Sequence, residues 1–277
     1  MRLVSWNVRY FSQGARGLWA TLDQVERVAG ALAALDPVPD VLALQELENG
    51  SLRGGARPQL ELFLEAFERA LAARGHPGGF VGTYFPAHRY TLGDTSLYTT
   101  GLAVVCAPAL APEPLGVTEI THVRLPAFAP LKQRRIAARV RLRPPGWARP
   151  VVLCNTHLSL PAFLEVGPHR VPRRMGCGSN QLAEIERVLA AVDLAEPTVI
   201  AGDFNSAPGS PVHARVLARG WATADPGGPT ARFLHHQMHL DHLFASPSVR
   251  LADVRTGPRA LADLSDHAPV FATLGLT

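Results

Sequence analysis

Residues 199–205 read Val-Ile-Ala-Gly-Asp-Phe-Asn, and this stretch decides the fold that we expect. A short apolar run bounded by turn residues predicts a buried strand, and Asp203 and Asn205 come directly after it. Strand ends in layered α/β folds are rigid positions from which side chains converge on a cleft. The stretch therefore predicts both a buried strand and a polar site at its end.

An apolar run followed by polar side chains recurs along the chain. Further examples are Asn7 after residues 3–6, Gln45-Glu46 after residues 41–44, Asn155-Thr156-His157 after residues 151–154, and the polar pairs Asp241-His242 and Asp266-His267 nearer the C-terminus. This many strand ends with polar side chains are typical of one shared site.

Strands and helices interleave in the sequence, which favours an α/β fold in which helices cover the faces of a sheet. Helices are expected over residues 18–35, 58–74 and 181–192, and strands over residues 3–6, 41–44, 102–106, 136–142, 151–155, 199–201 and 242–245. Loops are expected at the Pro/Gly-rich residues 107–114, 143–150, 161–178 and 225–229. Since no repeat or long linker interrupts this order, we expect a single domain over residues 1–277.

Composition narrows the class of protein without choosing a function. The chain has 27 Lys+Arg against 23 Asp+Glu, which makes it mildly basic and compatible with an anionic partner. Its three cysteines cannot form a paired disulfide framework, so a reducing compartment fits best. The N-terminal residues lack the signal-peptide pattern, and no apolar run reaches the roughly 20 residues of a spanning helix. We therefore expect a cytoplasmic protein, with secretion left open if a leader has been removed.

The polar residues are of the types that metal-assisted phosphoryl chemistry needs. A hard cation such as Mg²⁺ prefers carboxylate and carbonyl oxygens. Hydrolysis also needs a group that takes a proton from water, and a histidine oriented by a carboxylate is suited to this; His267 and Asp241 are the candidate pair. Polar donors such as Asn205, His157 and an arginine would stabilise charge on phosphoryl oxygens.

Three motifs taken together, Gly-Asp-Phe-Asn at 202–205, Leu-Asp-His-Leu-Phe at 240–244 and Ser-Asp-His-Ala-Pro-Val at 265–270, carry a specific resemblance. With Trp6-Asn7, Gln45-Glu46 and Asn155-Thr156-His157 in order before them, the chain resembles the endonuclease/exonuclease/phosphatase superfamily, also called deoxyribonuclease I-like. The resemblance implies a four-layered α/β sandwich of two packed mixed β-sheets flanked by helices. It also implies a phosphoesterase site at one end that uses Mg²⁺, with Mn²⁺ as a substitute.

The resemblance also implies roles for individual residues. Glu46 looks like the principal metal carboxylate, Asn7 and Asp266 complete that shell, and Asp203 positions or activates the nucleophile or leaving group and is counted as a metal ligand too. His267 looks like the catalytic histidine, oriented by Asp241. Asn205 and His157 look like contacts to the scissile phosphate. Arg135 occupies the position of a phosphate-binding arginine, with Arg134 as the alternative.

Other side chains have competing interpretations. His235, His236 and His239 could indicate a zinc site, but a polar loop before the strand at Asp241 fits the surrounding residues better. Cys106 and Cys154 lie within predicted strands and are expected to be buried hydrophobic residues.

The substrate is the least determined part of the prediction, because fold and core motifs do not choose it. A nuclease cleaving nucleic-acid phosphodiesters is favoured by the basic charge and by Arg170, Arg173 and Arg174 in the longest loop. The alternatives are a phospholipid or sphingomyelin phosphodiesterase, for which residues 160–164 would contact the membrane, and an inositol-phosphate phosphatase. An inactive binding module is disfavoured because every catalytic position holds a competent residue. No protein partner is indicated, and we expect a monomer.

Overall fold

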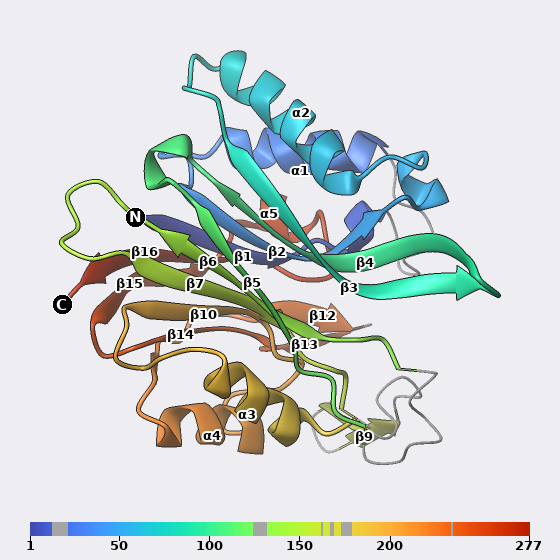
Figure 1. Cartoon of the computed structure of the whole chain (residues 1–277), viewed down its shortest axis with the longest axis vertical. Helices are drawn as coiled ribbons and strands as arrows, with labels where there is room; N and C mark the ends of the chain where they lie inside the picture. Colours follow the sequence, from blue (N-terminus) through green and yellow to red (C-terminus); the bar gives the residue numbers. More distant parts are fainter. Residues whose placement is uncertain (13–21, 124–131, 162, 167–168, 173–178, 234) are drawn as a thin grey trace.

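Two mixed six-stranded sheets lie face to face in the computed structural model, which describes residues 1–12, 22–123, 132–161, 163–166, 169–172, 179–233 and 235–277 (Figure 1). In sheet order, the first sheet consists of β15 (Val249–Thr256), β16 (Val270–Leu276), β1 (Arg2–Asn7), β2 (Val41–Asn49), β4 (Thr95–Cys106) and β3 (Val81–Leu92). The second consists of β11 (Ala222–Thr223), β14 (Asp241–Ala245), β10 (Thr198–Asp203), β7 (Val151–His157), β6 (Ile136–Leu142) and β5 (Glu113–Glu119). Each sheet has a parallel pair at its centre, β1 with β2 and β10 with β7.

Helices cover the outer face of each sheet, so the molecule has four layers, as the resemblance implied (Figure 1). The helices of the described part are α1 (Leu22–Ala33), α2 (Gln59–Ala72), α3 (Gln181–Ala190), α4 (Pro211–Ala218) and α5 (Arg259–Ala262). Helices α1 and α2 pack with the side chains on one face of β1 and β2, whereas α3 and α4 pack on the second sheet. A separate apolar cluster fills the space between the sheets.

The alternation of side chains along the strands explains this packing. Val4 and Trp6 of β1 join the cluster under α1 and α2, whereas Leu3 points the other way into the core between the sheets. In α2, Phe63 and Phe67 are one helical turn apart and their rings stack at 5.5 Å between centroids. The helical and strand periods of the sequence thus produce complementary apolar faces.

The central strands bring their polar ends to one end of the sandwich. In the parallel pair of β1 and β2, Asn7 lies opposite Gln45. In the second sheet Asp203 lies opposite both His157 and Asp241 on its two neighbours. The register of the strands therefore places the predicted site residues beside one another.

Gly202 is needed for this close approach of β10 to β7. Its φ is +150°, and a Cβ atom there would lie 1.9 Å from the carbonyl oxygen of Thr156. A side chain at this position would push the two strands apart directly beside Asp203.

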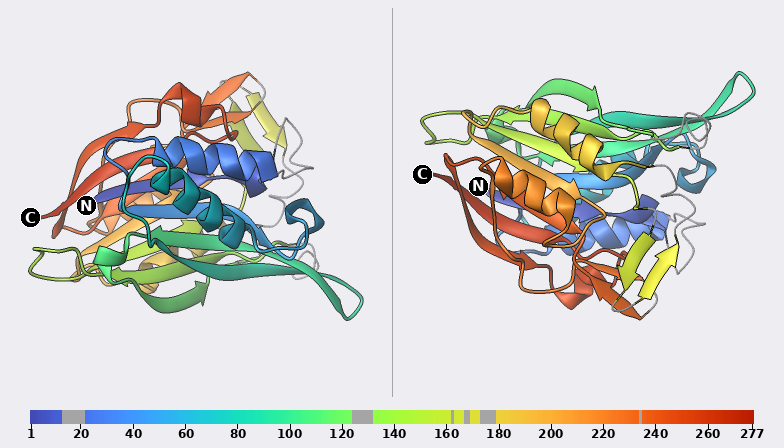
Figure 2. Two further views of the ribbon diagram at one scale, coloured as in Figure 1. Left: turned by 90° about the horizontal axis from the view of Figure 1, so that it is seen from above. Right: turned by 90° about the horizontal axis from the view of Figure 1, so that it is seen from below.

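A long hairpin of β3 and β4 extends past the body of the sandwich, as the views from above and below show (Figure 2). Only residues 102–106 of it were predicted as a strand. The polar and aromatic residues of β3 give little apolar periodicity, because this strand is at the sheet edge and half exposed.

Several predicted boundaries need correction. The predicted loop at residues 161–178 contains the antiparallel strands β8 (Phe163–Val166) and β9 (His169–Pro172), while residues 162, 167–168 and 173–178 lie outside the described part. The predicted loop at 107–114 holds a 3₁₀ turn, Pro108–Leu110, and the first residues of β5, which pair with β6. Both segments form strands through pairing with a neighbour, which turn residues in the sequence do not reveal.

The other predicted elements are confirmed with small shifts of their ends. The helix predicted over 18–35 is described from Leu22 to Ala33, with residues 18–21 outside the described part. Helices predicted over 58–74 and 181–192 end at Ala72 and Ala190. In the described ranges, no helix combines the length and hydropathy needed to cross a membrane.

Candidate active site

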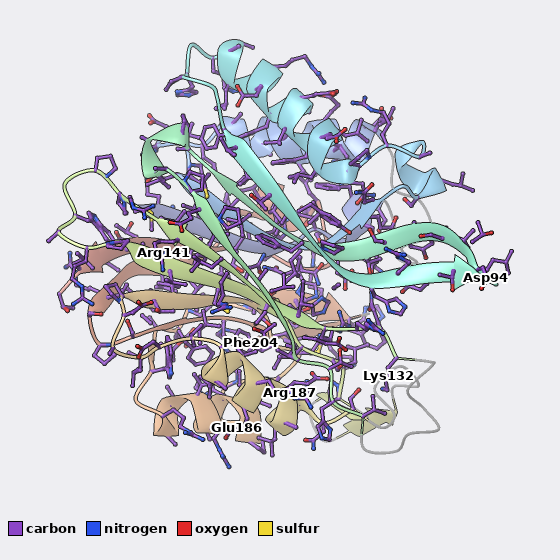
Figure 3. All side chains as sticks on the ribbon, viewed as in Figure 1. Asp94, Lys132, Arg141, Glu186, Arg187 and Phe204 are labelled. Atoms are coloured by element: carbon purple, nitrogen blue, oxygen red, sulfur yellow. The ribbon has the colours of Figure 1, made fainter. Side chains whose placement is uncertain are left out.

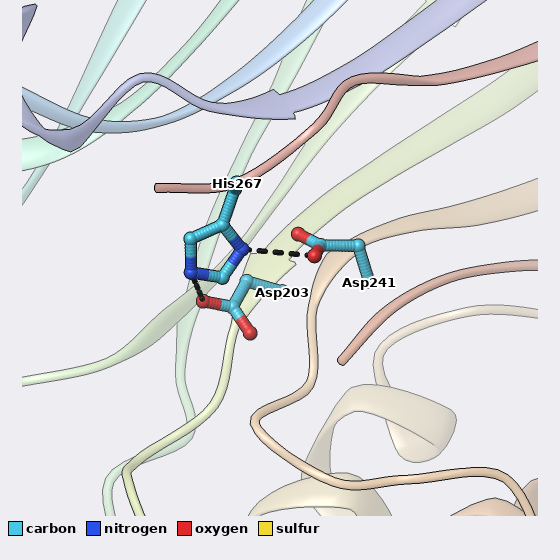
Figure 4. Close-up of side chains that lie close together, drawn as sticks. All are labelled: Asp203, Asp241 and His267. Carbon is cyan, nitrogen blue, oxygen red and sulfur yellow. Dashed lines mark hydrogen bonds and ion pairs between the residues drawn. The ribbon is translucent and has the colours of Figure 1, made fainter. Parts of the chain in front are cut away.

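His267 lies between two carboxylates at the end of the second sheet (Figure 4). Its Nδ1 is 2.8 Å from Oδ2 of Asp241, and its Nε2 is 3.7 Å from Oδ2 of Asp203. The Trp6 indole donates a hydrogen bond of 2.8 Å to the carbonyl of His267, which fixes the segment that carries the ring. The predicted histidine–aspartate pair is therefore present and is joined by a second carboxylate.

The two carboxylates determine the charge of His267. Burial lowers the pKa of His267, but the negative charges of Asp241 and Asp203 outweigh burial and raise it well above the usual value. Burial also raises the pKa of Asp203 to about 7, even though the nearby His267 acts in the opposite direction. At neutral pH the imidazole is protonated beside a carboxylate that can bind a proton.

Asp241 is fixed from its backbone and keeps one oxygen available. Its main-chain N–H donates to Oγ1 of Thr230 at 3.0 Å. Oδ2 binds His267, whereas the buried Oδ1 has no hydrogen-bond partner among the described residues. This geometry orients the ring of His267 without involving Asp241 in further contacts.

Asp203 is held by the two asparagines that the sequence analysis named. Asn7 Nδ2 donates to Asp203 Oδ2 at 3.0 Å, and the backbone N–H of Asn205 donates to Oδ1 at 2.8 Å. Asn205 has a φ of +47°, a conformation that asparagine adopts more readily than most residues. The carboxylate of Asp203 is thereby fixed between both sheets.

Arg135, His157 and Asn205 form a chain of contacts beside Asp203. Arg135 NH1 is 3.0 Å from His157 Nδ1, and Asn205 Nδ2 lies 3.1 Å from His157 Nε2 and donates to the carbonyl of Leu158. Burial, followed by the positive charges of Arg135 and His267, lowers the pKa of His157 well below its usual value. Because a guanidinium only donates, Nδ1 of this neutral ring is the acceptor and Nε2 carries the hydrogen, which faces Oδ2 of Asp203 at 3.4 Å. The amide nitrogen of Asn205 is also a donor, so its contact with Nε2 is not a hydrogen bond.

The contact to His157 shows which of the two neighbouring arginines reaches the site. Arg135 is buried and its guanidinium reaches His157 in the site. The exposed guanidinium of Arg134, the alternative, lies 3.9 Å from Glu119 instead.

Glu46 lies at a β-bulge in β2 with a φ of +58°. Burial and then the charge of Asp266 raise the pKa of Glu46, and Oε1 is 3.9 Å from Nε2 of His157. Asp266 forms an ion pair of 3.0 Å with Arg9. A half-buried carboxylate that repels a second carboxylate fits a divalent cation, because the ion would offset both charges.

A second possible metal group lies beside the first and includes Asp203. The ligand atoms of Asp203, Asp241 and His267 all lie within 4.8 Å of one another, so these residues could also hold an ion. In this group the imidazolium already supplies a positive charge between the carboxylates. The donors around Glu46 and Asp266 fit a hard cation better.

The structure brings all the predicted site residues to one end of the sandwich. Asp241, His267, Asp203, Asn7, Asn205, His157 and Arg135 are linked by the contacts given above, and Glu46 and Asp266 adjoin them. Sequence reasoning missed Arg9 and Tyr10, which follow Asn7 by two and three residues. Burial and the charge of Glu46 raise the pKa of Tyr10, so this phenol forms part of the wall of the site.

The remaining sequence-based interpretations concern histidines and cysteines. His236 is in the short strand β13 (His236–Met238), and within the described ranges His235, His236 and His239 belong to no group that could hold a metal. Cys106 and Cys154 are buried, as expected, and burial raises the pKa of both thiols to about 12. Cys177, Arg173 and Arg174 lie outside the described residues.

Comparisons with known proteins place this geometry in a family. The model of the Endonuclease/Exonuclease/phosphatase family matches residues 4–267, whereas none of the curated proteins matches the sequence significantly. Among solved structures, an endonuclease/exonuclease/phosphatase family protein from Leptotrichia buccalis has a TM-score of 0.70 at 15% identity, with 99% of both chains covered. An endonuclease/exonuclease/phosphatase from Beutenbergia cavernae has a TM-score of 0.67 at 22% identity, covering 99% of this chain and 71% of the other.

The catalytic domain of human Nocturnin with bound sulfate is also similar, with a TM-score of 0.62 at 19% identity, covering 100% of this chain and 93% of the other. These structures share the fold, and the family match spans every motif from the first strand to His267. The chain belongs to the endonuclease/exonuclease/phosphatase family of phosphoesterases.

Proposed function

We propose that this chain is a metal-dependent phosphodiester hydrolase that cleaves nucleic acid by in-line attack of water. The observation that carries the proposal is the arrangement of Asp203, His267 and Asp241, in which a proton acceptor and a protonated imidazole lie side by side. The proposal treats residues 1–277 as one catalytic domain that acts as a cytoplasmic monomer.

Asp203 is the better candidate for the base. Its carboxylate is fixed by Asn7 and Asn205, and burial brings its pKa to about 7, close to the pH at which a general base works best. His267 already holds a proton at neutral pH, so it can donate to a phosphoryl oxygen or to the leaving group.

His157 and Arg135 provide donors for the phosphate. The guanidinium of Arg135 fixes the tautomer of His157, so that the hydrogen on Nε2 points toward the site. Asn205 adds its amide beside this nitrogen. Together these donors would stabilise the negative charge that develops on phosphoryl oxygens.

Glu46, Asp266 and Asn7 would hold the metal ion. A bound Mg²⁺ or Mn²⁺ supplies a Lewis acid that offsets charge on the phosphoryl group. Asn7 donates its amide hydrogen to Asp203, so its Oδ1 is the atom that remains for a cation. The same oxygen accepts a hydrogen bond of 3.0 Å from the backbone of Arg9, which orients it.

A second candidate, a lipid phosphodiesterase, is favoured by a different observation. Leu92 and Leu97 are 74% and 49% exposed at the tip of the β3–β4 hairpin, at the end of the molecule where the site lies. Residues 160–164, named as a membrane contact, are described in part only, and Ala162 lies outside the described residues. An inositol-phosphate phosphatase stays the further alternative.

A substrate panel tests the proposal. Supercoiled plasmid, single-stranded DNA, RNA, sphingomyelin in vesicles and inositol phosphates would be incubated with Mg²⁺ or Mn²⁺, with EDTA and an Asp203→Asn variant as blanks. We expect metal-dependent cleavage of nucleic acid that is lost in the variant. Turnover of the lipid alone, or of inositol phosphates alone, would contradict the proposal and favour the corresponding alternative.

A further inference from the structure

A groove of about 730 Å³ lies beside the catalytic pocket, between the base of the β3–β4 hairpin and the segment that leads into β6. It shares Ala87 and Arg134 with the small pocket that contains Glu46, Arg135 and His157. The labelled Lys132, which lines the groove, and Asp94 at the hairpin tip lie at the same end of the molecule (Figure 3). The groove therefore adjoins the pocket that Glu46 and His157 line.

The groove is positively charged. Among the described residues, its lining includes the cations Arg89, Lys132 and Arg134 against a single carboxylate, Glu119. The 3.9 Å separation of Arg134 from Glu119 is at the limit of an ion pair, and both side chains are more than half exposed. An anionic ligand could therefore replace Glu119 as the partner of Arg134 at little cost in free energy.

Arg135 extends into the small pocket, and Arg134, its neighbour in sequence, lines the groove. Arg135 is pinned by its backbone N–H, which donates to Thr121 at 2.7 Å, and its guanidinium reaches His157 in the catalytic pocket. Arg134 donates its own backbone N–H to His88 Nδ1 and carries its guanidinium to the groove. Two adjacent phosphates of one nucleic-acid strand would therefore meet Arg135 and Arg134 in turn.

A pair of aromatic rings adjoins His88 of the groove. Tyr90 and Tyr98 stack with their centroids 4.5 Å apart, and His88, which lines the groove, contacts Tyr90 edge-on at 4.5 Å. Aromatic pairs beside a basic groove are the combination by which proteins bind single-stranded nucleic acid, since bases stack on the rings while cations track the backbone.

We propose that this groove is a binding subsite for the single nucleic-acid strand that adjoins the scissile phosphate. Arg134 binds a flanking phosphate, and the Tyr90–Tyr98 pair packs against a neighbouring base. The inference deepens the proposed function and rests on it for the identity of the strand. A single strand is favoured over a lipid surface because the described lining is mainly polar and cationic.

The test measures binding without hydrolysis. Fluorescein-labelled oligothymidylate would be titrated in EDTA against the whole protein, followed by anisotropy over a range of salt concentrations. Arg134→Gln should weaken binding about tenfold and reduce the slope of log affinity against log salt by about 0.7. Glu119→Gln should tighten binding about threefold, because it removes the competing carboxylate.

Arg143→Gln is the matched control. Arg143 follows the opposite end of β6, is exposed to a similar degree and pairs with Glu113 at 2.9 Å. Equal affinities and salt slopes for Arg134→Gln and Arg143→Gln would overturn the inference. An equal loss of binding to anionic vesicles in Arg134→Gln would also overturn the inference. The groove would then recognise negative charge alone and not a nucleic-acid strand.

The two proposals fail separately. Binding that depends on Arg134 without cleavage of any nucleic acid would retain the groove and contradict the proposed function. Cleavage that is sensitive to Asp203, together with binding that is indifferent to Arg134, would retain the function and remove the subsite.

Discussion

Glu46 combines a left-handed backbone with a half-buried charge, two features that cost stability and are typical of functional positions. Its raised pKa means that the folded protein binds a proton more readily there than the unfolded chain does. Stability is therefore lost as the pH rises through the pKa of the folded state.

Glu46→Gln should therefore raise the stability of the protein in EDTA and at the same time raise its Mg²⁺ requirement. In EDTA at neutral pH we expect a higher melting temperature than for the wild type, because the amide carries no charge to bury. The Mg²⁺ concentration needed for half-maximal activity should rise at least about tenfold, since even indirect partners of a metal change its affinity by about 10–100-fold. Thermal melts and metal titrations measure both. An unchanged metal titration would show that Glu46 does not hold the ion.

His242 gives a prediction about pH and stability. Burial lowers its pKa to about 4, although the ring nitrogen Nε2 lies 2.7 Å from the carbonyl of Ser206. The unfolded chain therefore binds a proton at higher pH than the folded protein does. Stability should fall as the pH drops from about 6.5 to about 4, by about 3 kcal/mol from this one group.

His242→Gln removes this titration. Urea unfolding at pH 7 and pH 4.5 should show a smaller loss of stability in the variant than in the wild type, with the exposed His235→Gln as the control. A pH dependence equal to that of the wild type would mean that other groups cause the acid sensitivity.

At the scale of elements, one polar bridge joins the two sheets beside Glu46. Asn155 of β7 accepts from Gln45 Nε2 at 2.9 Å and donates to the carbonyls of Leu44 and Ala103 at 3.0 Å. Because Gln45 directly precedes Glu46, the bridge fixes the start of the β-bulge that presents the carboxylate.

Asn155→Ala should lower the free energy of unfolding by about 3 kcal/mol, at about 1 kcal/mol for each hydrogen bond lost. It should also raise the Mg²⁺ requirement with little change in turnover at saturating metal. Ser246→Ala is the matched control: its buried hydroxyl bonds to Thr198 and Glu196, away from the site, so it should cost stability alone. An equal effect of both variants on the Mg²⁺ requirement would contradict a positioning role for Asn155.

Strands and helices with a regular pattern of apolar residues could be predicted from the sequence. Strands that pair with a single neighbour could not. The buried strands at the centre of each sheet are continuous apolar runs, so their positions were found within a few residues. β3, β5 and the β8–β9 pair are held by a single neighbour and have mixed patterns, and only the fold shows what they pair with.

At the scale of the whole molecule, packing two sheets with their central parallel pairs aligned is what creates the site. Asn7 and Glu46 come from the first sheet, whereas Asp203, His157 and Asp241 come from the second. The motifs identified these residues because each lies at an end of an apolar run in the sequence. Arg9 and Tyr10 were missed, because their roles depend on how distant segments meet and no local pattern encodes it.

The central claim is that His267, held by Asp241 beside Asp203, takes part in metal-dependent phosphodiester hydrolysis. The most direct measurement is nicking of supercoiled plasmid over a Mg²⁺ titration, with an EDTA blank, by the wild type, His267→Ala and His213→Ala purified in parallel. His213 is partly buried on α4, outside the site, and serves as the matched histidine control. We predict metal-dependent nicking that falls at least about a hundredfold in His267→Ala and persists in His213→Ala. Equal nicking by both variants, or none by the wild type at any metal concentration, would contradict the account.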